Sequence, residues 1–203
     1  MAIVHCQLLF STILYVLVFV GSLITISTVA YAKSNSDGLC YLYIRKDTIE
    51  PPVLPCTMII YASGGTLAYA VIMAIYHGYG TLVASRESHI GRTMWVMPWL
   101  LLNAFAVVIT FICACVYSIG FHITCSTREE ISGITTGCEF VVDAYKTKST
   151  AEIVGWINVL LWGCLVGIEG LRLARNRRAI SREVYEDQGS SDAVKIGDVL
   201  PTA

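Results

Sequence analysis

Four long apolar runs dominate the pattern of hydrophobic and polar positions along the chain, and short polar islands separate them. The charged residues Asp, Glu, Lys and Arg are absent from residues 1–32, 57–85, 93–127 and 153–168. Each run reaches or approaches the roughly 20 apolar residues that cross a hydrocarbon core about 30 Å thick. The pattern therefore predicts an all-α membrane protein built as a four-transmembrane-helix bundle. We expect spans at about 7–31, 57–81, 94–120 and 151–171.

Composition agrees with this prediction and indicates the domain organisation. Of the 203 residues, 55% are hydrophobic and only 14% are charged, whereas a soluble domain carries about 25% charged residues. We expect a four-helix transmembrane domain over residues 1–178. The polar tail 179–203, which contains "SREVYEDQGSSD", is expected to be cytoplasmic and disordered. The net charge of −1 gives no sign of a nucleic-acid partner.

The first apolar run has an alternative interpretation as a cleaved signal peptide. The tripeptide "AYA" at residues 30–32 resembles a small-residue cleavage site. However, no basic residue precedes the run, and the run is much longer than the about 7–15 apolar residues of a signal core. A first transmembrane helix is therefore the favoured interpretation.

Arginines gather just after the fourth span and indicate the orientation of the chain. Lys and Arg are enriched in the cytoplasmic loops of membrane proteins, so this basic cluster is expected in the cytoplasm. Both termini are then cytoplasmic, and the connections 32–56 and 121–150 face the outside. The cluster can also bind anionic membrane lipid. We expect the protein in the plasma membrane rather than in an internal membrane. Its members are Arg172, Arg175, Arg177, Arg178 and Arg182.

Cysteines fall in pairs in the two connections that we expect outside. Cys40 and Cys56 lie in the first of these, and Cys125 and Cys138 lie in the second. Disulfides persist in oxidising compartments, so the pattern predicts two short disulfide-stapled exoplasmic loops. Pairing within each loop is the simplest of three connectivities, and pairing across the loops stays open. Closing a loop of about 15 residues stabilises the fold by roughly 3 kcal/mol.

Small residues recur at i, i+4 spacing in the second and fourth spans, where they would let helix backbones approach closely. They either pack inside the bundle, which is the favoured interpretation, or form a surface for the helix of a partner. The set comprises Gly64, Ala68, Ala70, Ala74, Gly78, Gly163 and Gly167.

Polar side chains inside the spans are few. We expect Asn103 and Asn158 to form hydrogen bonds between helices. Glu169 lies three residues before Arg172, so we expect an ion pair at the surface or the membrane interface. Neither interpretation requires an ion pathway through the bilayer.

Residues that could perform chemistry share no recognisable arrangement. The histidines at 5, 77, 89 and 122 have no ligand spacing in common, and Cys113 and Cys115 point apart on a helix. Neither a phosphate-binding loop nor a nucleophile elbow is present in the sequence. We therefore expect no enzyme activity, no cofactor and no metal site. Cys6 is a candidate for acylation, but an unmodified thiol that faces lipid is the favoured interpretation. Tyr185 is a candidate for phosphorylation, but a solvated acidic tail is the favoured interpretation there.

Short motifs around the spans resemble the transmembrane protein 179 family. In chain order they are "GLCYLY", "PPVLPC", "YSIGFHITC" and "TTGCEF", followed by a Trp-rich fourth span and a basic tail. The resemblance extends over about residues 7–178 and implies a four-span integral membrane protein without assigned catalysis. Claudins fit less well, because the first connection lacks their long Trp-bearing segment. Vesicle proteins of the physin type, with a cysteine pair in each lumenal loop, are the nearest rival by architecture.

Two functions are consistent with these features. The first is a non-catalytic accessory subunit that associates with another integral membrane protein, namely a channel or a receptor. The second is a self-assembling tetraspan protein that forms a pore or organises vesicles and membranes. Both would use the small-residue surfaces, and the identity of the partner distinguishes them.

Overall fold

The computed structural model describes residues 2–34, 40, 42–43, 53–84, 97–132 and 142–197. Within these residues the chain forms four long helices and no strand, which confirms the all-α fold predicted from the apolar runs. The helices are α1 (Ala2–Ser34), α2 (Leu54–Ala84), α4 (Met97–Ser132) and α5 (Val142–Gly197).

Each helix contains a stretch that is long and apolar enough to cross a membrane. These stretches hold 29 to 31 residues and are longer than the predicted spans. At 1.5 Å per residue they are about 44 Å long, which matches the hydrocarbon core together with its headgroup layers. Residues 94–96 of the predicted third span lie outside the described residues. The four stretches are Cys6–Ser34, Leu54–Leu82, Met97–Thr127 and Ser149–Arg178.

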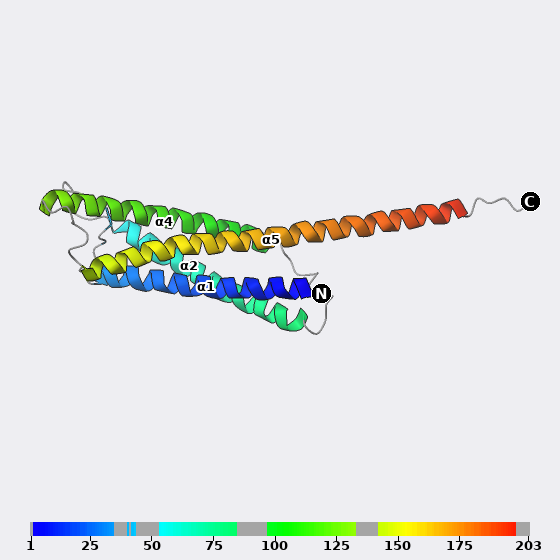
Figure 1. Ribbon diagram of the computed structural model, residues 1–203, viewed down its shortest axis with the longest axis horizontal. Helices are drawn as coiled ribbons and strands as arrows, with labels where there is room; N and C mark the ends of the chain where they lie inside the picture. Colours follow the sequence, from blue (N-terminus) through cyan, green and yellow to red (C-terminus); the bar gives the residue numbers. More distant parts are fainter. Residues whose placement is uncertain are drawn as a thin grey trace, which may run out of the picture.

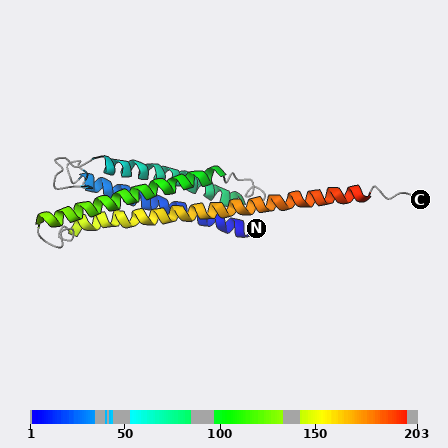
Figure 2. The ribbon, with the colours of Figure 1, turned by 90° about the horizontal axis from the view of Figure 1, so that it is seen from above.

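Successive helices run in opposite directions and form one elongated bundle (Figures 1 and 2). One end of the bundle gathers the last turns of α1 and α4 and the first turns of α2 and α5; we call it the disulfide end. At the other end, the arginine end, α1 begins and α5 continues far beyond its neighbours. The α1 helix packs on α2 and on α5, and α4 packs on α5; among these neighbouring pairs of the bundle, α2 and α4 form the least extensive contact.

Large apolar side chains cover the outside of this bundle. Ile75 is 68% exposed, and Leu101 and Leu160 are each 69% exposed. A water-soluble protein rarely presents so much contiguous apolar surface. In a bilayer these side chains meet lipid tails that are as apolar as they are. The outer surface therefore agrees with an integral multi-pass membrane protein.

Buried apolar residues form one cluster in each half of the bundle. Towards the arginine end, the fully buried Trp162 stacks on Tyr69 and meets the edge of Tyr15. At the disulfide end, Ile59 and Tyr117 pack with the cysteines that close the first connection. Because lipid does not drive helices together, close packing of this kind is the main source of association inside the bundle.

The polar tail differs from the disordered segment that we expected from residue 179. The α5 helix continues to Gly197, so the described part of the tail is helical. Once a helix has nucleated, each further residue that is fixed adds one backbone hydrogen bond. Extension of α5 into the tail therefore avoids the unfavourable first turn of a new helix. The continuation contains helix-favouring Ala, Arg and Glu and no proline before residue 201.

Candidate functional site

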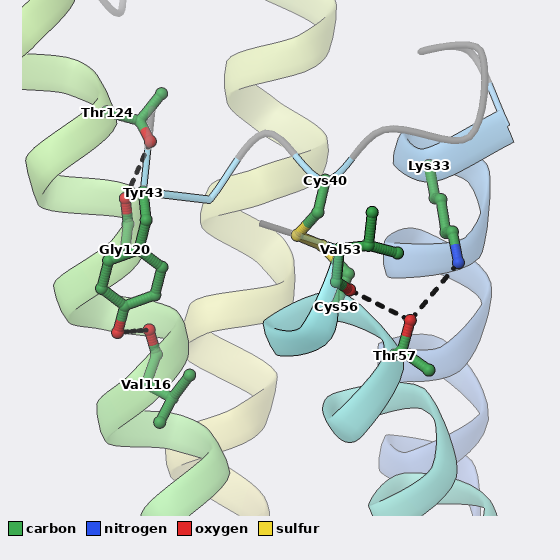
Figure 3. Close-up of a disulfide and its surroundings, with 9 residues drawn as sticks. All are labelled: Lys33, Cys40, Tyr43, Val53, Cys56, Thr57, Val116, Gly120 and Thr124. Carbon is green, nitrogen blue, oxygen red and sulfur yellow. Dashed lines mark hydrogen bonds between the residues drawn. A yellow bond between two sulfur atoms is a disulfide. The ribbon is translucent and has the colours of Figure 1, made fainter. Parts of the chain in front are cut away.

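A disulfide closes the first connection, as the sequence pattern suggested. Cys40 and Cys56 are both buried, and their Cα atoms lie 5.8 Å apart (Figure 3). Cys125 is disulfide-bonded as well, while Cys138 lies outside the described residues. The bond between Cys40 and Cys56 joins the residues after α1 to the first turn of α2, and therefore fixes where the connection lies on the bundle.

Tyr43 fastens the same connection to α4. Its backbone N–H donates a hydrogen bond to the carbonyl of Gly120 at 3.3 Å, and its hydroxyl donates to the carbonyl of Val116 at 3.0 Å (Figure 3). A Cβ atom added to Gly120 would lie 2.7 Å from Cε2 of Tyr43 and 3.1 Å from Cβ of Leu42. Only glycine at this position lets the ring lie flat against α4. We call Cys40, Leu42 and Tyr43 the strap.

Three of the predicted small residues face the interior of the bundle. Ala70 is fully buried, Ala74 packs against the same core, and a Cβ atom on Gly78 would meet a Thr12 methyl group at 3.8 Å. These residues line the close contact between α2 and α1. Their role is therefore internal packing.

The other four small residues face outward. Ala68, Gly163 and Gly167 are exposed, and Gly64 is half-buried. A Cβ atom added to any of these three glycines would meet no protein atom within 4 Å. Within the described residues, no neighbouring helix uses this space.

A buried ion pair lies towards the arginine end. Arg172 donates from Nη1 to both carboxylate oxygens of Glu169, at 2.9 and 3.1 Å. Glu169 is 1% exposed and Arg172 is 7% exposed. The pair expected at the surface or the interface is therefore an interior pair. Nε2 of His77, on α2, faces the same carboxylate at 3.7 Å, so the pair points toward a neighbouring helix.

Asn103 extends this polar region to the remaining two helices. Its side-chain oxygen accepts hydrogen bonds from the hydroxyls of Tyr15 and Tyr69, at 3.1 and 3.0 Å. The ring of Tyr15 stacks on His77, with 5.3 Å between the ring centres. All four helices therefore contribute to one group, which we call the polar cluster. Its members are Tyr15, Tyr69, His77, Asn103, Glu169 and Arg172.

The polar cluster can hold the helices in a fixed register, because each buried polar group loses its partner when a helix shifts. Both ring nitrogens of His77 and the hydroxyl of Ser11 are buried without a hydrogen-bond partner in the described part of the structure. An imidazole and a carboxylate 3.7 Å apart are too distant for a direct hydrogen bond, but a bridging water molecule can connect them. Ionisable residues inside a membrane mark functional regions by default.

Sequence reasoning treated His77 as an isolated histidine and missed this cluster. A usable signal was present, because His77 and Glu169 both lie in the last third of spans that run in the same direction. Two ionisable side chains at the same membrane depth can meet across a narrow bundle. The close approach of Gly21 to Asn158 was missed too: a Cβ atom on Gly21 would lie 2.9 Å from Cγ of Asn158.

The basic cluster is divided by the structure. Arg172 is committed to Glu169 inside the bundle, whereas Arg175, Arg177 and Arg178 are exposed where α5 leaves the arginine end. The side chain of Arg182 lies outside the described residues. Arg175 and Arg178 lie where an interfacial role is expected for basic side chains.

These features define a four-span helical membrane protein that is tied at one end by a disulfide and at the other by a polar cluster. Residues 7–192 match the family model described as the transmembrane protein 179/179B claudin domain, and the chain belongs to that family. The resemblance noted from the motifs is thereby confirmed. The argument that claudins fit less well was wrong for the domain, since the family description itself names a claudin domain. No curated protein and no solved structure matches the chain significantly.

Proposed function

We propose that this protein is a non-catalytic accessory subunit that binds a channel or receptor in the membrane through the outward face of α5. The observation that carries the proposal is the open space over Gly163 and Gly167. Membrane helices associate chiefly through van der Waals contact, and small residues allow the closest approach. A partner helix with one large side chain could fill that space.

The internal packing of the bundle does not depend on these glycines. Inside the bundle, close approach is made by other small positions, such as Ala70 on α2 and Gly21 on α1. Outward glycine costs about 0.5–1 kcal/mol relative to alanine in a helix interior and brings no contact within the described chain. A partner would account for glycine at both positions.

The test is gentle solubilisation of the native protein, followed by mass measurement and identification of the bound chains. Leucine at Gly163 and Gly167 together should remove a stoichiometric partner, because each isobutyl group fills the space that the partner helix would occupy. A second variant carries leucine at Gly64 and Ala68, on the outward face of α2. The matched control is Gly65→Leu, at another open glycine of α2 that belongs to neither pair.

Each outcome of this experiment discriminates. Loss of the partner in the α5 variant with retention in Gly65→Leu supports the proposal. Capture that survives leucine at Gly163 and Gly167 contradicts the assignment to α5, and loss only in the α2 variant would move the surface to Gly64 and Ala68. A particle that contains only copies of this chain would favour the self-assembling alternative, and its copy number would show whether a central pore is geometrically possible.

We also propose that both termini face the cytoplasm. The exposed Arg175 and Arg178 support this orientation, because they lie at the end of the bundle where α5 leaves it. An epitope tag on either terminus should be reached by antibody only after the plasma membrane is permeabilised. A tag that is stained on intact cells would reverse the orientation.

A further inference from the structure

A small cavity lies among the four helices, separate from the polar cluster and from the outward glycines. It is lined by residues of α1, α2, α4 and α5 in the half of the bundle towards the disulfide end. Its volume of about 30 Å³ compares with the 10–15 Å³ that a single water molecule requires, so it has room for about two water-sized groups. Most of the surface that it presents is apolar, and its polar groups come from all four helices.

Threonine hydroxyls in the wall present acceptors rather than donors to the cavity. Thr25, Thr66 and Thr110 each donate the hydroxyl proton to a carbonyl of their own helix. A hydroxyl has one proton and two lone pairs, so only lone pairs remain for a ligand. This arrangement favours a ligand that donates hydrogen bonds.

Two further groups strengthen this preference. The side-chain oxygen of Asn158 is buried and has no hydrogen-bond partner in the described part of the chain. Glu152 also lines the cavity, and no described residue forms an ion pair with its carboxylate. The side-chain amine of Lys33, a cation of this end of the bundle, instead donates to Thr57. A carboxylate beside several neutral acceptors is suited to a cation with N–H donors.

We propose that this cavity binds the ammonium head group of a single-chain membrane amphiphile, with Glu152 as its ion-pair partner. A primary ammonium and its first carbon are two water-sized groups, which is the space available. The chain would lie along the seam between α2 and α4, since these helices form the least extensive contact among the neighbouring pairs of the bundle and both line the cavity. Lipid tails outside that seam are a matching environment for an alkyl chain.

The test uses the full-length protein in nanodiscs of a zwitterionic lipid. Three photoreactive probes share one diazirine-bearing alkyl chain and differ only in the head group: primary amine, alcohol or carboxylate. The amine is expected to label peptides of α2 and α4 at least about tenfold more efficiently than the carboxylate, and unlabelled long-chain amine should compete. Glu152→Gln should weaken amine labelling about tenfold.

Thr110→Val probes the cavity without changing a charge. It is expected to lower amine labelling severalfold, while its matched control Thr28→Val should not. Thr28 makes the same kind of hydrogen bond to its own helix but is on the exposed side of α1. Equal labelling by the three probes, or amine labelling that survives both Glu152→Gln and Thr110→Val, overturns the proposal. Absence of saturable labelling by any probe also overturns it, and leaves water as the occupant.

Discussion

The buried ion pair between Glu169 and Arg172 gives the sharpest test of the polar cluster. Replacing Arg172 with methionine keeps most of the side-chain length and removes the guanidinium. The carboxylate of Glu169 would then be 1% exposed, with His77 at 3.7 Å as the nearest charged or polar partner from another helix. The two hydrogen bonds at 2.9 and 3.1 Å would both be lost.

The expected destabilisation follows from that geometry. Removing one member of a buried ion pair typically costs about 3–5 kcal/mol, because the remaining charge keeps its desolvation penalty without its partner. Replacing both members with apolar residues of similar volume is often neutral or stabilising by about 1–4 kcal/mol. We therefore expect Arg172→Met to lower the free energy of unfolding by about 3 kcal/mol. The double variant Glu169→Met/Arg172→Met should lie within about 1 kcal/mol of the wild type.

Unfolding by denaturant in micelles, followed by tryptophan fluorescence, measures these differences, since Trp162 lies in the same half of the bundle. The matched control is Arg175→Met, an exposed arginine one turn further along α5, where we expect a change within about 0.5 kcal/mol. Two results would refute the reasoning. One is equal stability of Arg172→Met and Arg175→Met; the other is a double variant as unstable as the sum of the two single variants.

Two further predictions concern the strap. Gly120→Ala should destabilise the fold by about 1–3 kcal/mol through overlap with Tyr43, whereas Gly155→Ala should be neutral or stabilising. At Gly155 the nearest atom to an added Cβ lies 4.0 Å away, so alanine fits there. Equal denaturation midpoints for the two variants would contradict the close contact between Gly120 and Tyr43. Cys56→Ser should cost about 3 kcal/mol, because the disulfide spans a separation of 16 residues. Thermal unfolding with and without reductant checks this, and an unchanged transition in both conditions would contradict it.

Much of the architecture could be predicted from the sequence, because the bilayer imposes one dominant constraint. Backbone groups must be paired internally in hydrocarbon, so a long run without charged residues has few folds available. The four runs therefore predict four helices, and their lengths limit where each helix lies. The placement of Cys40 and Cys56 in one short connection likewise made a bond between them the simplest of three pairings, although the sequence left pairing across the loops open.

The rotation of each helix was not predictable in the same way. Gly163 and Ala70 belong to similar small-residue patterns, yet one faces outward and the other is fully buried. Both faces of a membrane helix are apolar, so hydrophobic periodicity gives little indication of which face is inside. The polar residues do carry that information: Asn103, His77 and Glu169 all point inward, because hydrocarbon does not hydrogen-bond them.

The two ends of the bundle are fastened by different chemistry, and this difference has a consequence for function. At the arginine end, hydrogen bonds to Asn103 join α1, α2 and α4, and the approach of His77 to Glu169 at 3.7 Å places α5 against them. At the disulfide end, the strap ties the start of α2 to α4 through a covalent bond and the Tyr43 hydroxyl. Neither fastening involves the outward Gly163 and Gly167, nor Thr110 and Glu152 in the cavity wall. Substitutions on the outward face or in the cavity should therefore alter binding while the bundle stays folded, so loss of a partner or of a ligand can be separated from loss of the fold.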